Sequence, residues 1–332
     1  MLTSQPLGTG GFGIEDLLVD TAYAHPVAHL RLLQTHISWV VLTGPYAYKV
    51  KKPVRYAFID ASTLERRRFL CEEELRLNRR FARDLYVDVV PIVRDGGLLK
   101  VGGSGEPVEF AVRMHEFDPS QELAAQLAQG TVTAGDMAAL ATRLADSHLR
   151  AAVATAQVPF GSFDKVRAAM LENFSLLRTH LSDPQDLKLL ERLTTWTNGS
   201  LARLKSLMHS RRQAGMVREC HGDLHARNIV RWREQWLPFD CLEFDPELRW
   251  VDVISDVAFL FMDLSSRHRE DLAHEFLSRY LEKTGDYEGL RLLPLYAAYL
   301  ALVRAKDTRM GEIAINARVI LDALEPKTEA KP

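Results

Sequence analysis

The pattern of hydrophobic and polar positions divides the chain into a strand-rich first third and a largely helical remainder. In the first third, short runs of β-branched and aromatic residues alternate with glycine, proline or polar turns. Gly44-Pro45 and Asp95-Gly96-Gly97 have the composition of hairpin turns between such runs. We therefore expect five strands of an antiparallel sheet, at 36–43, 46–52, 85–93, 98–101 and 107–117.

Helical patterns account for most of the rest. Ser62-Thr63-Leu64-Glu65 forms a capping box before an apolar stripe that runs to about Phe81, which predicts one helix among the strands. Apolar spacing of three and four residues dominates after residue 119, except at 229–232 and 236–245, which have the pattern of a hairpin. The expected later helices are 119–128, 134–152, 163–180, 184–211, 249–264, 268–284 and 289–321.

These patterns predict an α+β chain with two lobes. The N-lobe, at 14–115, would be an antiparallel sheet with one helix, and the C-lobe, at 116–322, would be mostly helical. We expect residues 1–13 to form a flexible tail and residues 323–332 to be a charged, disordered end.

Composition narrows the class of protein. The 332 residues are 47% hydrophobic and 26% charged, which is typical of globular proteins, and the net charge of −2 gives no overall field for nucleic acid or membranes. The three cysteines are widely spaced and lack a CxxC pair, which indicates reduced thiols and argues against a zinc site. Without a secretory pattern or a membrane-spanning run, we expect a cytoplasmic protein, monomeric or weakly dimeric, with no nucleic-acid or membrane partner.

The candidate chemistry centres on the loop HGDLHARN, at 221–228. It places His221, Asp223 and Asn228 just before the expected hairpin. In phosphoryl transfer of the kinase type, an Asp on such a loop orients the attacking hydroxyl, and an Asn five residues later binds Mg²⁺ together with an acid beyond the next strand. Asp240, on the expected metal strand 236–245, fits that acid, and Glu243 competes for the role. A His-Gly-Asp turn with no chemistry is the plainer interpretation.

A lysine and a glutamate in the N-lobe fit the phosphate-binding part of such a site. Ala47-Tyr48-Lys49 on the second strand makes Lys49 the first choice for the phosphate-binding lysine, with Lys51 in reserve. Glu74 lies in the apolar stripe of the first helix, where a buried carboxylate needs a cation such as Lys49. The alternatives are a strand edge made soluble by lysines and an ordinary surface contact of Glu74 with Arg67 or Asn78.

Three further segments are candidates for nucleotide contacts or support. Residues 8–13, GTGGFG, match Gly-x-Gly-x-x-Gly but lie too far before the lysine strand, so we expect Thr35 and Ser38 in the turn 33–38 to cover the phosphates. Met114 and His115, at the exit from the sheet, would contact adenine. Asp256, in a nearly all-apolar helix, would support the backbone of the catalytic loop near His221.

The spelling HGDxxxxN resembles the aminoglycoside phosphotransferase and choline-kinase-like superfamily. CHGDLHARNI, FDCLEFDPELRWVDVISDVAFL and THISWVVLTGPYAYKVKKP together resemble an uncharacterised bacterial family within it, many of whose members carry a C-terminal P-loop ATP-binding domain that this chain is too short to include. One departure is Tyr299-Leu300-Ala301, where the family would lead us to expect Tyr-Arg-Ala.

The resemblance implies a two-lobed protein-kinase-like fold, with ATP and Mg²⁺ as cofactors and a small molecule as the hydroxyl acceptor. A nucleotide-binding pseudokinase without turnover is the alternative, favoured by the missing glycine-rich loop. A protein kinase is disfavoured because no DFG or APE segment is present. The sequence does not identify the acceptor, since fold-level analogy does not fix a substrate.

Overall fold

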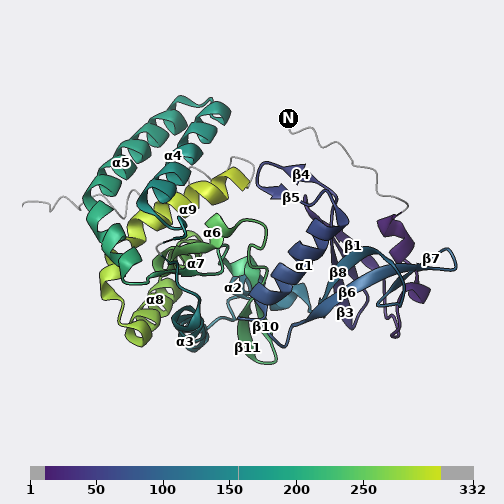
Figure 1. Cartoon of the computed structure of the whole chain (residues 1–332). Helices are drawn as coiled ribbons and strands as arrows, with labels where there is room; N and C mark the ends of the chain where they lie inside the picture. Colours follow the sequence, from purple (N-terminus) through teal and green to yellow (C-terminus); the bar gives the residue numbers. More distant parts are fainter. Residues whose placement is uncertain (1–11, 156, 308–332) are drawn as a thin grey trace, which may run out of the picture. The chain divides into compact units, whose positions relative to one another are not determined.

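The computed structural model describes residues 12–155 and 157–307 and separates into two compact units (Figure 1). The first unit contains the described residues up to Ala125 together with Val230–Pro246. The second contains Gln126–Ile229 and the described residues from Glu247 onward. One unit is built on a sheet and the other mainly from helices, which confirms the predicted α+β class.

A six-stranded sheet with order β1-β2-β3-β8-β6-β7 forms the first unit, and all of its neighbouring strands are antiparallel. The prediction of five strands was therefore one short. The additional strand is β1, which overlaps the segment that we expected to be a turn, and its pairing with β2 is a contact that local pattern does not encode. The strands are β1 Arg31–Gln34, β2 Ser38–Leu42, β3 Tyr46–Lys51, β6 Tyr86–Asp95, β7 Leu98–Val101 and β8 Pro107–His115.

Helix α1, Leu64–Asn78, packs on one face of the sheet, mainly against β8, β6 and β3. Its N-cap is Thr63, whose hydroxyl accepts a hydrogen bond from the Arg66 backbone, so the helix begins one residue later than a Ser62 cap would place it. The Ser62 hydroxyl instead donates to Asp60, in the short hairpin of β4 Arg55–Tyr56 and β5 Ile59–Asp60.

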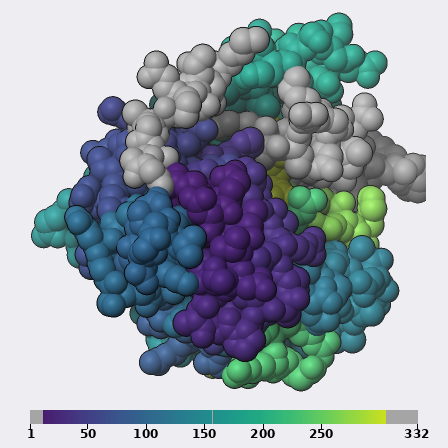
Figure 2. All heavy atoms as spheres, turned by 90° about the vertical axis from the view of Figure 1, so that its right-hand side faces the viewer, coloured from purple at the N-terminus to yellow at the C-terminus, as the bar shows by residue number. Residues whose placement is uncertain are grey.

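The N-terminal segment covers the opposite face of the sheet. Its two 3-10 turns, Ile14–Leu17 and Asp20–Ala22, contribute buried side chains to a core shared with β2, β3, β6 and β7. Figure 2 shows this segment in purple at the surface, beside the strands in blue. Phe12 is buried in the same core, so the described end of the predicted tail is packed, while residues 1–11 lie outside the described residues.

After the catalytic loop the chain returns to the first unit, an excursion that the predicted lobe boundaries did not include. The hairpin of β10 Ile229–Trp232 and β11 Gln235–Pro238 turns at Arg233 and Glu234, both of which have positive φ. Its apolar side chains join a core with those of β3, β8 and α1. The second strand ends at Pro238, so Asp240 follows the strand, contrary to the predicted strand 236–245.

Helices build the second unit around α7, Val253–Ser266, which is buried along almost its whole length. The N-cap of α7 is Asp252, and the buried Arg211 guanidinium binds both Asp252 and Asp286, which ties α7 to α5. The other helices are α2 Leu123–Ala128, which leads in from the first unit, α3 Ala134–Arg150, α4 Phe163–His180, α5 Pro184–Gln213, α6 Pro246–Arg249, α8 Glu270–Thr284 and α9 Leu293–Asp307.

The C-terminal part of this unit agrees only in part with the predicted helix. The expected helix 289–321 begins as a 3-10 turn, Tyr287–Arg291, followed by α9, and its residues beyond 307 lie outside the described part of the chain, as does the predicted tail 323–332. Within residues 12–155 and 157–307, no helix is both long and apolar enough to cross a bilayer.

Candidate functional site

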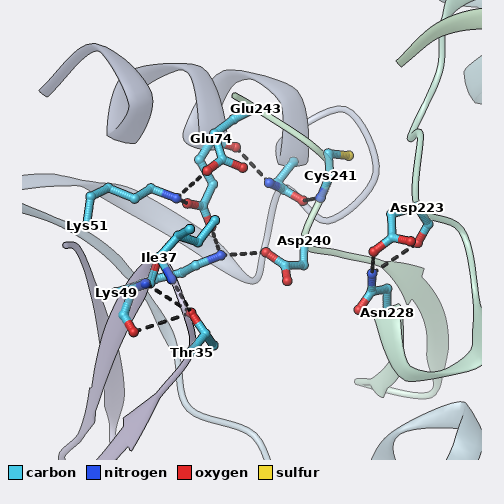
Figure 3. Close-up of polar contacts among 12 residues, drawn as sticks. Thr35, Ile37, Lys49, Lys51, Glu74, Asp223, Asn228, Asp240, Cys241 and Glu243 are labelled. Carbon is cyan, nitrogen blue, oxygen red and sulfur yellow. Dashed lines mark hydrogen bonds and ion pairs between the residues drawn. The ribbon is translucent and has the colours of Figure 1, made fainter. Parts of the chain in front are cut away.

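Two lysines of β3 and three carboxylates form a charged cluster in the first unit (Figure 3). Alternation along the strand places Lys49 and Lys51 on the face that α1 covers, and Glu74 of α1 lies between them. Glu74 accepts from Lys49 Nζ at 2.8 Å and from Lys51 Nζ at 2.5 Å. The reserve lysine is therefore part of the same group as the first choice.

The two lysines differ in their second partner. Lys49 Nζ also contacts Asp240 Oδ1 at 2.5 Å, whereas Lys51 Nζ contacts Glu243 Oε1 at 2.5 Å. The Asp240 side chain is 43% exposed and that of Glu243 is 3% exposed. The cluster thus has an open end at Lys49 and Asp240 and a closed end at Lys51 and Glu243.

The carboxylates outnumber the lysines, which affects the charge state of Lys49. Two lysine charges against three carboxylate charges leave a formal charge of −1. Burial by itself would lower the pKa of Lys49, but the carboxylates of Asp240 and Glu74 raise it by more, and the pKa lies well above its usual value. Lys49 is therefore a fixed positive charge at the open end of the cluster.

The backbone that carries Asp240 is held by side chains from the C-terminal end of α1 and from β6. The Tyr86 hydroxyl accepts from the Asp240 N–H, and Asn78 Oδ1 accepts from the Cys241 N–H at 2.9 Å. Asn78 in turn donates to the Glu74 carbonyl at 2.8 Å. Asp240 has φ of 62°, a left-handed conformation that these bonds maintain.

The expected phosphate turn is a tight connection between β1 and β2. Thr35 Oγ1 accepts from the Ile37 and Ser38 N–H groups at 3.3 and 3.0 Å (Figure 3). Ser38 is fully buried, and its hydroxyl has no hydrogen-bond partner within the described residues. Thr35 is exposed and Ser38 is enclosed, so of the two expected phosphate contacts only Thr35 has an accessible side chain.

The two residues expected at the adenine contact lie at the end of β8. Met114 is buried in the core that β8 shares with the β10–β11 hairpin. The His115 ring stacks on Tyr46 and Trp232, with ring centroids 5.3 and 5.5 Å apart. Both side chains are engaged within the first unit, and the His115 and Glu116 N–H groups donate to the carbonyls of Leu85 and Pro45.

The catalytic loop belongs to the second unit, where Asp223 and Asn228 contact each other (Figure 3). Asn228 Nδ2 donates to the Asp223 carbonyl at 3.0 Å and to its Oδ2 at 2.9 Å. The Asp223 side chain is 31% exposed. The five-residue spacing thus brings the expected base and the expected metal ligand together through a 3-10 turn, Ala226–Asn228.

Two carboxylates of α7 accept hydrogen bonds from the backbone of this loop. Asp256 accepts from the His221 and Gly222 N–H groups, each at 2.8 Å, and Asp263 accepts from the Ala226 N–H at 2.8 Å. The sequence analysis found Asp256 but missed Asp263. The seven-residue spacing of the two acids along an apolar helix was the signal, because it places both on one face.

His221 is fully buried, and its ring accepts from the Asp223 N–H at 3.3 Å. This contact suits support of the loop better than contact with a substrate. Gly222 has φ of +87°, and a Cβ there would lie 2.8 Å from the Leu248 carbonyl oxygen. Gly222, which stands where the protein-kinase motif has another residue, is therefore required by the local backbone conformation.

The three cysteines are buried and their thiols are reduced, as the spacing predicts. Burial raises the pKa of the Cys71 thiol to about 12. His148, Cys220 and Asp256 lie close enough together to suggest a metal site, but Asp256 already accepts two backbone amides and contacts His148 Nε2 at 3.2 Å. A metal there would have to displace the bonds that hold the catalytic loop.

No protein-family profile matches the chain. It is 34% identical over 289 residues to uncharacterized protein Rv2004c of Mycobacterium tuberculosis and, with the same identity, to uncharacterized protein Mb2027c of Mycobacterium bovis. The match covers 86% of this chain and 56% of each relative, so the chain spans about half the length of the curated relatives it matches.

Solved structures share the fold at low sequence identity. Choline kinase from Cryptosporidium parvum aligns with a TM-score of 0.52 and 12% identity over 94% of both chains. A glucosamine kinase aligns with a TM-score of 0.52 and 17% identity over 91% of this chain and 79% of its own. The GDP and kanamycin complex of APH(2")-IIia aligns with a TM-score of 0.50 and 11% identity over 93% of this chain and 97% of its own. The chain therefore has the same kinase-like fold as these three structures, as the resemblance of its motif implied.

Replacing Lys51 with Met should lower the free energy of unfolding by about 3–5 kcal/mol, because it removes the cation that binds the buried Glu243 and one of the two cations that bind Glu74. Lys49→Met is the matched control on the same strand. Its loss should be smaller, since Glu74 keeps Lys51 and Asp240 is partly exposed. Adding Glu243→Gln to Lys51→Met should recover part of the loss. Urea denaturation measures all three, and equal losses for the two lysine variants would contradict the assignment.

Replacing Asp256 with Asn should destabilise the protein, with a pH dependence of known sign. Burial would raise the pKa of Asp256, but the His148 ring and the His221 backbone lower it by more, so its pKa lies below the usual value. The carboxylate therefore contributes fully above its unfolded-state pKa, about 3.9, and its contribution is lost as the pH falls through the folded-state value. The difference in unfolding free energy between wild type and variant should be constant near neutral pH and shrink in acid. A difference that grows on acidification would refute this.

Proposed function

We propose that this chain transfers the γ-phosphoryl group of ATP to a hydroxyl of a small molecule, with Mg²⁺ as cofactor. The observation that carries the proposal is the pairing of Asp223 with Asn228 on the HGDxxxxN loop of a kinase-like fold. The open end of the lysine cluster supplies the second element that such chemistry needs, a fixed cation beside an exposed acid.

Lys49 would bind the nucleotide phosphates, and Glu74 would hold Lys49 in place. Lys49 is charged, only 13% exposed and anchored to Glu74, so it loses little conformational freedom when it meets a phosphate. Its contact with Asp240 is the part of the cluster that a nucleotide would rearrange, because Asp240 is partly exposed. The backbone of the turn around Thr35 and the end of β8 at Met114 and His115 are the proposed contacts for phosphates and adenine.

Oxygen donors suited to Mg²⁺ are present in both units. The Asn228 amide nitrogen is used by Asp223, which leaves Oδ1, an atom that accepts no hydrogen bond from any residue that the structure describes. Asp240 offers a carboxylate, whereas Glu243 is enclosed with Lys51. Magnesium prefers such hard oxygen ligands, and when bound it would neutralise charge on the phosphates. The proposal assigns Asn228 and Asp240 to the metal and gives Glu243 a structural role.

Asp223 would orient the acceptor hydroxyl and take its proton. Its Oδ2 is bonded by Asn228, and its side chain is partly exposed, so Oδ1 is the oxygen that can face a substrate. Because the transition state of phosphoryl transfer is loose, positioning and neutralisation of charge supply most of the rate, and a strong base is unnecessary. The acceptor is proposed only as a class, a hydroxyl-bearing small molecule.

Asp223→Ala should abolish phosphoryl transfer and leave the affinity for Mg²⁺-ATP nearly unchanged, because Asp223 contacts the acceptor and not the nucleotide. Turnover would be measured against a panel of aminoglycosides, amino alcohols, sugars and nucleosides. Asp271→Ala removes an exposed carboxylate of α8 in the same unit and should have no effect on turnover. If the wild type binds ATP but phosphorylates no member of the panel, a nucleotide-binding module without turnover becomes the better description.

Asp240→Asn should reduce the Mg²⁺-dependent part of nucleotide affinity by at least about tenfold, a typical loss for a change at a metal site. Glu243→Gln should leave that part intact and instead lower stability, because it breaks the buried pair with Lys51. Nucleotide titrations with Mg²⁺ and with a chelator measure the difference. The reverse result would make Glu243 the metal ligand.

A further inference from the structure

The second histidine of the catalytic loop lies against the proposed base. His225 Nε2 is 3.4 Å from Asp223 Oδ2, and the His225 side chain is only 8% exposed. The contact lies within the second unit and involves two residues of one short loop. Neither the motif chemistry nor the roles assigned above give His225 any task.

Two neighbours fix the orientation of the His225 ring. Nδ1 is 3.2 Å from the backbone nitrogen of Arg227, which can only donate, so Nδ1 accepts. The ring also meets Phe259 of α7 edge-to-face, with centroids 5.5 Å apart and planes at 71°. In the neutral ring the hydrogen is therefore carried by Nε2, and Nε2 is the atom that faces Asp223.

The donors around Asp223 converge on one of its two oxygens. Asn228 Nδ2 donates to Oδ2 at 2.9 Å, and His225 Nε2 approaches the same oxygen. Throughout the described part of the chain, nothing donates to Oδ1. A carboxylate fixed through Oδ2 from two directions presents Oδ1 in a single orientation.

We propose that His225 is a positioning residue for Asp223, an inference that rests on the proposed phosphotransferase function. Its Nε2–H holds Oδ2, so that Oδ1 accepts the proton of the acceptor hydroxyl. The oxygen of that hydroxyl bonds to the γ-phosphorus of ATP as the bond from this phosphorus to the bridging oxygen breaks, and ADP leaves with the electron pair. His225 donates this hydrogen bond and exchanges no proton in the step. The 3.4 Å separation shortens to a hydrogen bond when the acceptor is bound, as catalytic contacts do on substrate binding.

Two substitutions separate the functions of the two ring nitrogens. In His225→Asn the amide oxygen occupies the place of Nδ1 and can still accept from the Arg227 N–H, but no group reaches Asp223. In His225→Gln the amide nitrogen occupies the place of Nε2 and can donate to Asp223. We expect kcat to fall about 10- to 100-fold in His225→Asn, the usual effect of removing an outer hydrogen-bond partner at an active site, with KM for ATP unchanged. His225→Gln should recover most of kcat.

A spectroscopic readout keeps the inference testable whichever acceptor is found. In protein with isotope-labelled histidine, the resonance of His225 is identified by its absence in His225→Gln. We expect the Nε2–H tautomer in the wild type and a displaced Nε2 resonance in Asp223→Asn. The Nδ1–H tautomer, or a resonance that Asp223→Asn leaves unmoved, would overturn the inference.

The kinetic outcomes separate this inference from the proposed function. If the wild type is active and His225→Asn matches it in kcat, His225 has no positioning role and the phosphotransferase assignment survives. If His225→Gln is as slow as His225→Asn although both unfold at the wild-type temperature, donation from Nε2 is also refuted. If the wild type transfers no phosphoryl group to water or to any member of the panel, the proposed function fails, and with it the catalytic meaning of the contact.

Discussion

A carboxylate that is buried away from water is costly unless cations bind it, and in the first unit Glu74 is fully buried. Both lysines of β3 bind it, and each lysine continues to an acid on the segment after β11. One buried charge therefore joins the sheet, helix α1 and the segment from Asp240 to Glu243. The fixed charge of Lys49 depends on that junction, and the Asn78 bond to the Cys241 N–H holds the same segment at its backbone.

The second unit meets the same constraint with backbone amides. Asp256 and Asp263 lie in an apolar helix, and their partners include the N–H groups of His221, Gly222 and Ala226. These amides belong to a loop that has few regular hydrogen bonds of its own. The buried carboxylates and the loop N–H groups therefore serve as each other's hydrogen-bond partners, which also orders the loop. The loop then holds Asp223 against Asn228.

Side-chain exposure divides the carboxylates described above into two groups. Glu74, Glu243, Asp256 and Asp263 are buried and fully engaged in holding neighbouring groups. Asp223 and Asp240 have partly exposed side chains, at 31% and 43%. This separation favours Asp240 over Glu243 as a metal ligand and supports the proposed distribution of roles.

Local sequence determined the features of this protein that depend on short-range order. Alternation and turn residues located five of the six sheet strands and put both lysines on one face, and apolar spacing located the helices. The HGDxxxxN motif led us to expect the kinase-like fold, and the stripe in α1 singled out Glu74. Tertiary structure decided the pairing of β1, the end of the strand at Pro238, and the sharing of Glu74 between Lys49 and Lys51. It also decided that Glu243 is enclosed and that Asp263 supports the loop. The physical reason is distance along the chain: Lys51 and Glu243 are 192 residues apart, so their pairing follows from packing and leaves no trace in local periodicity.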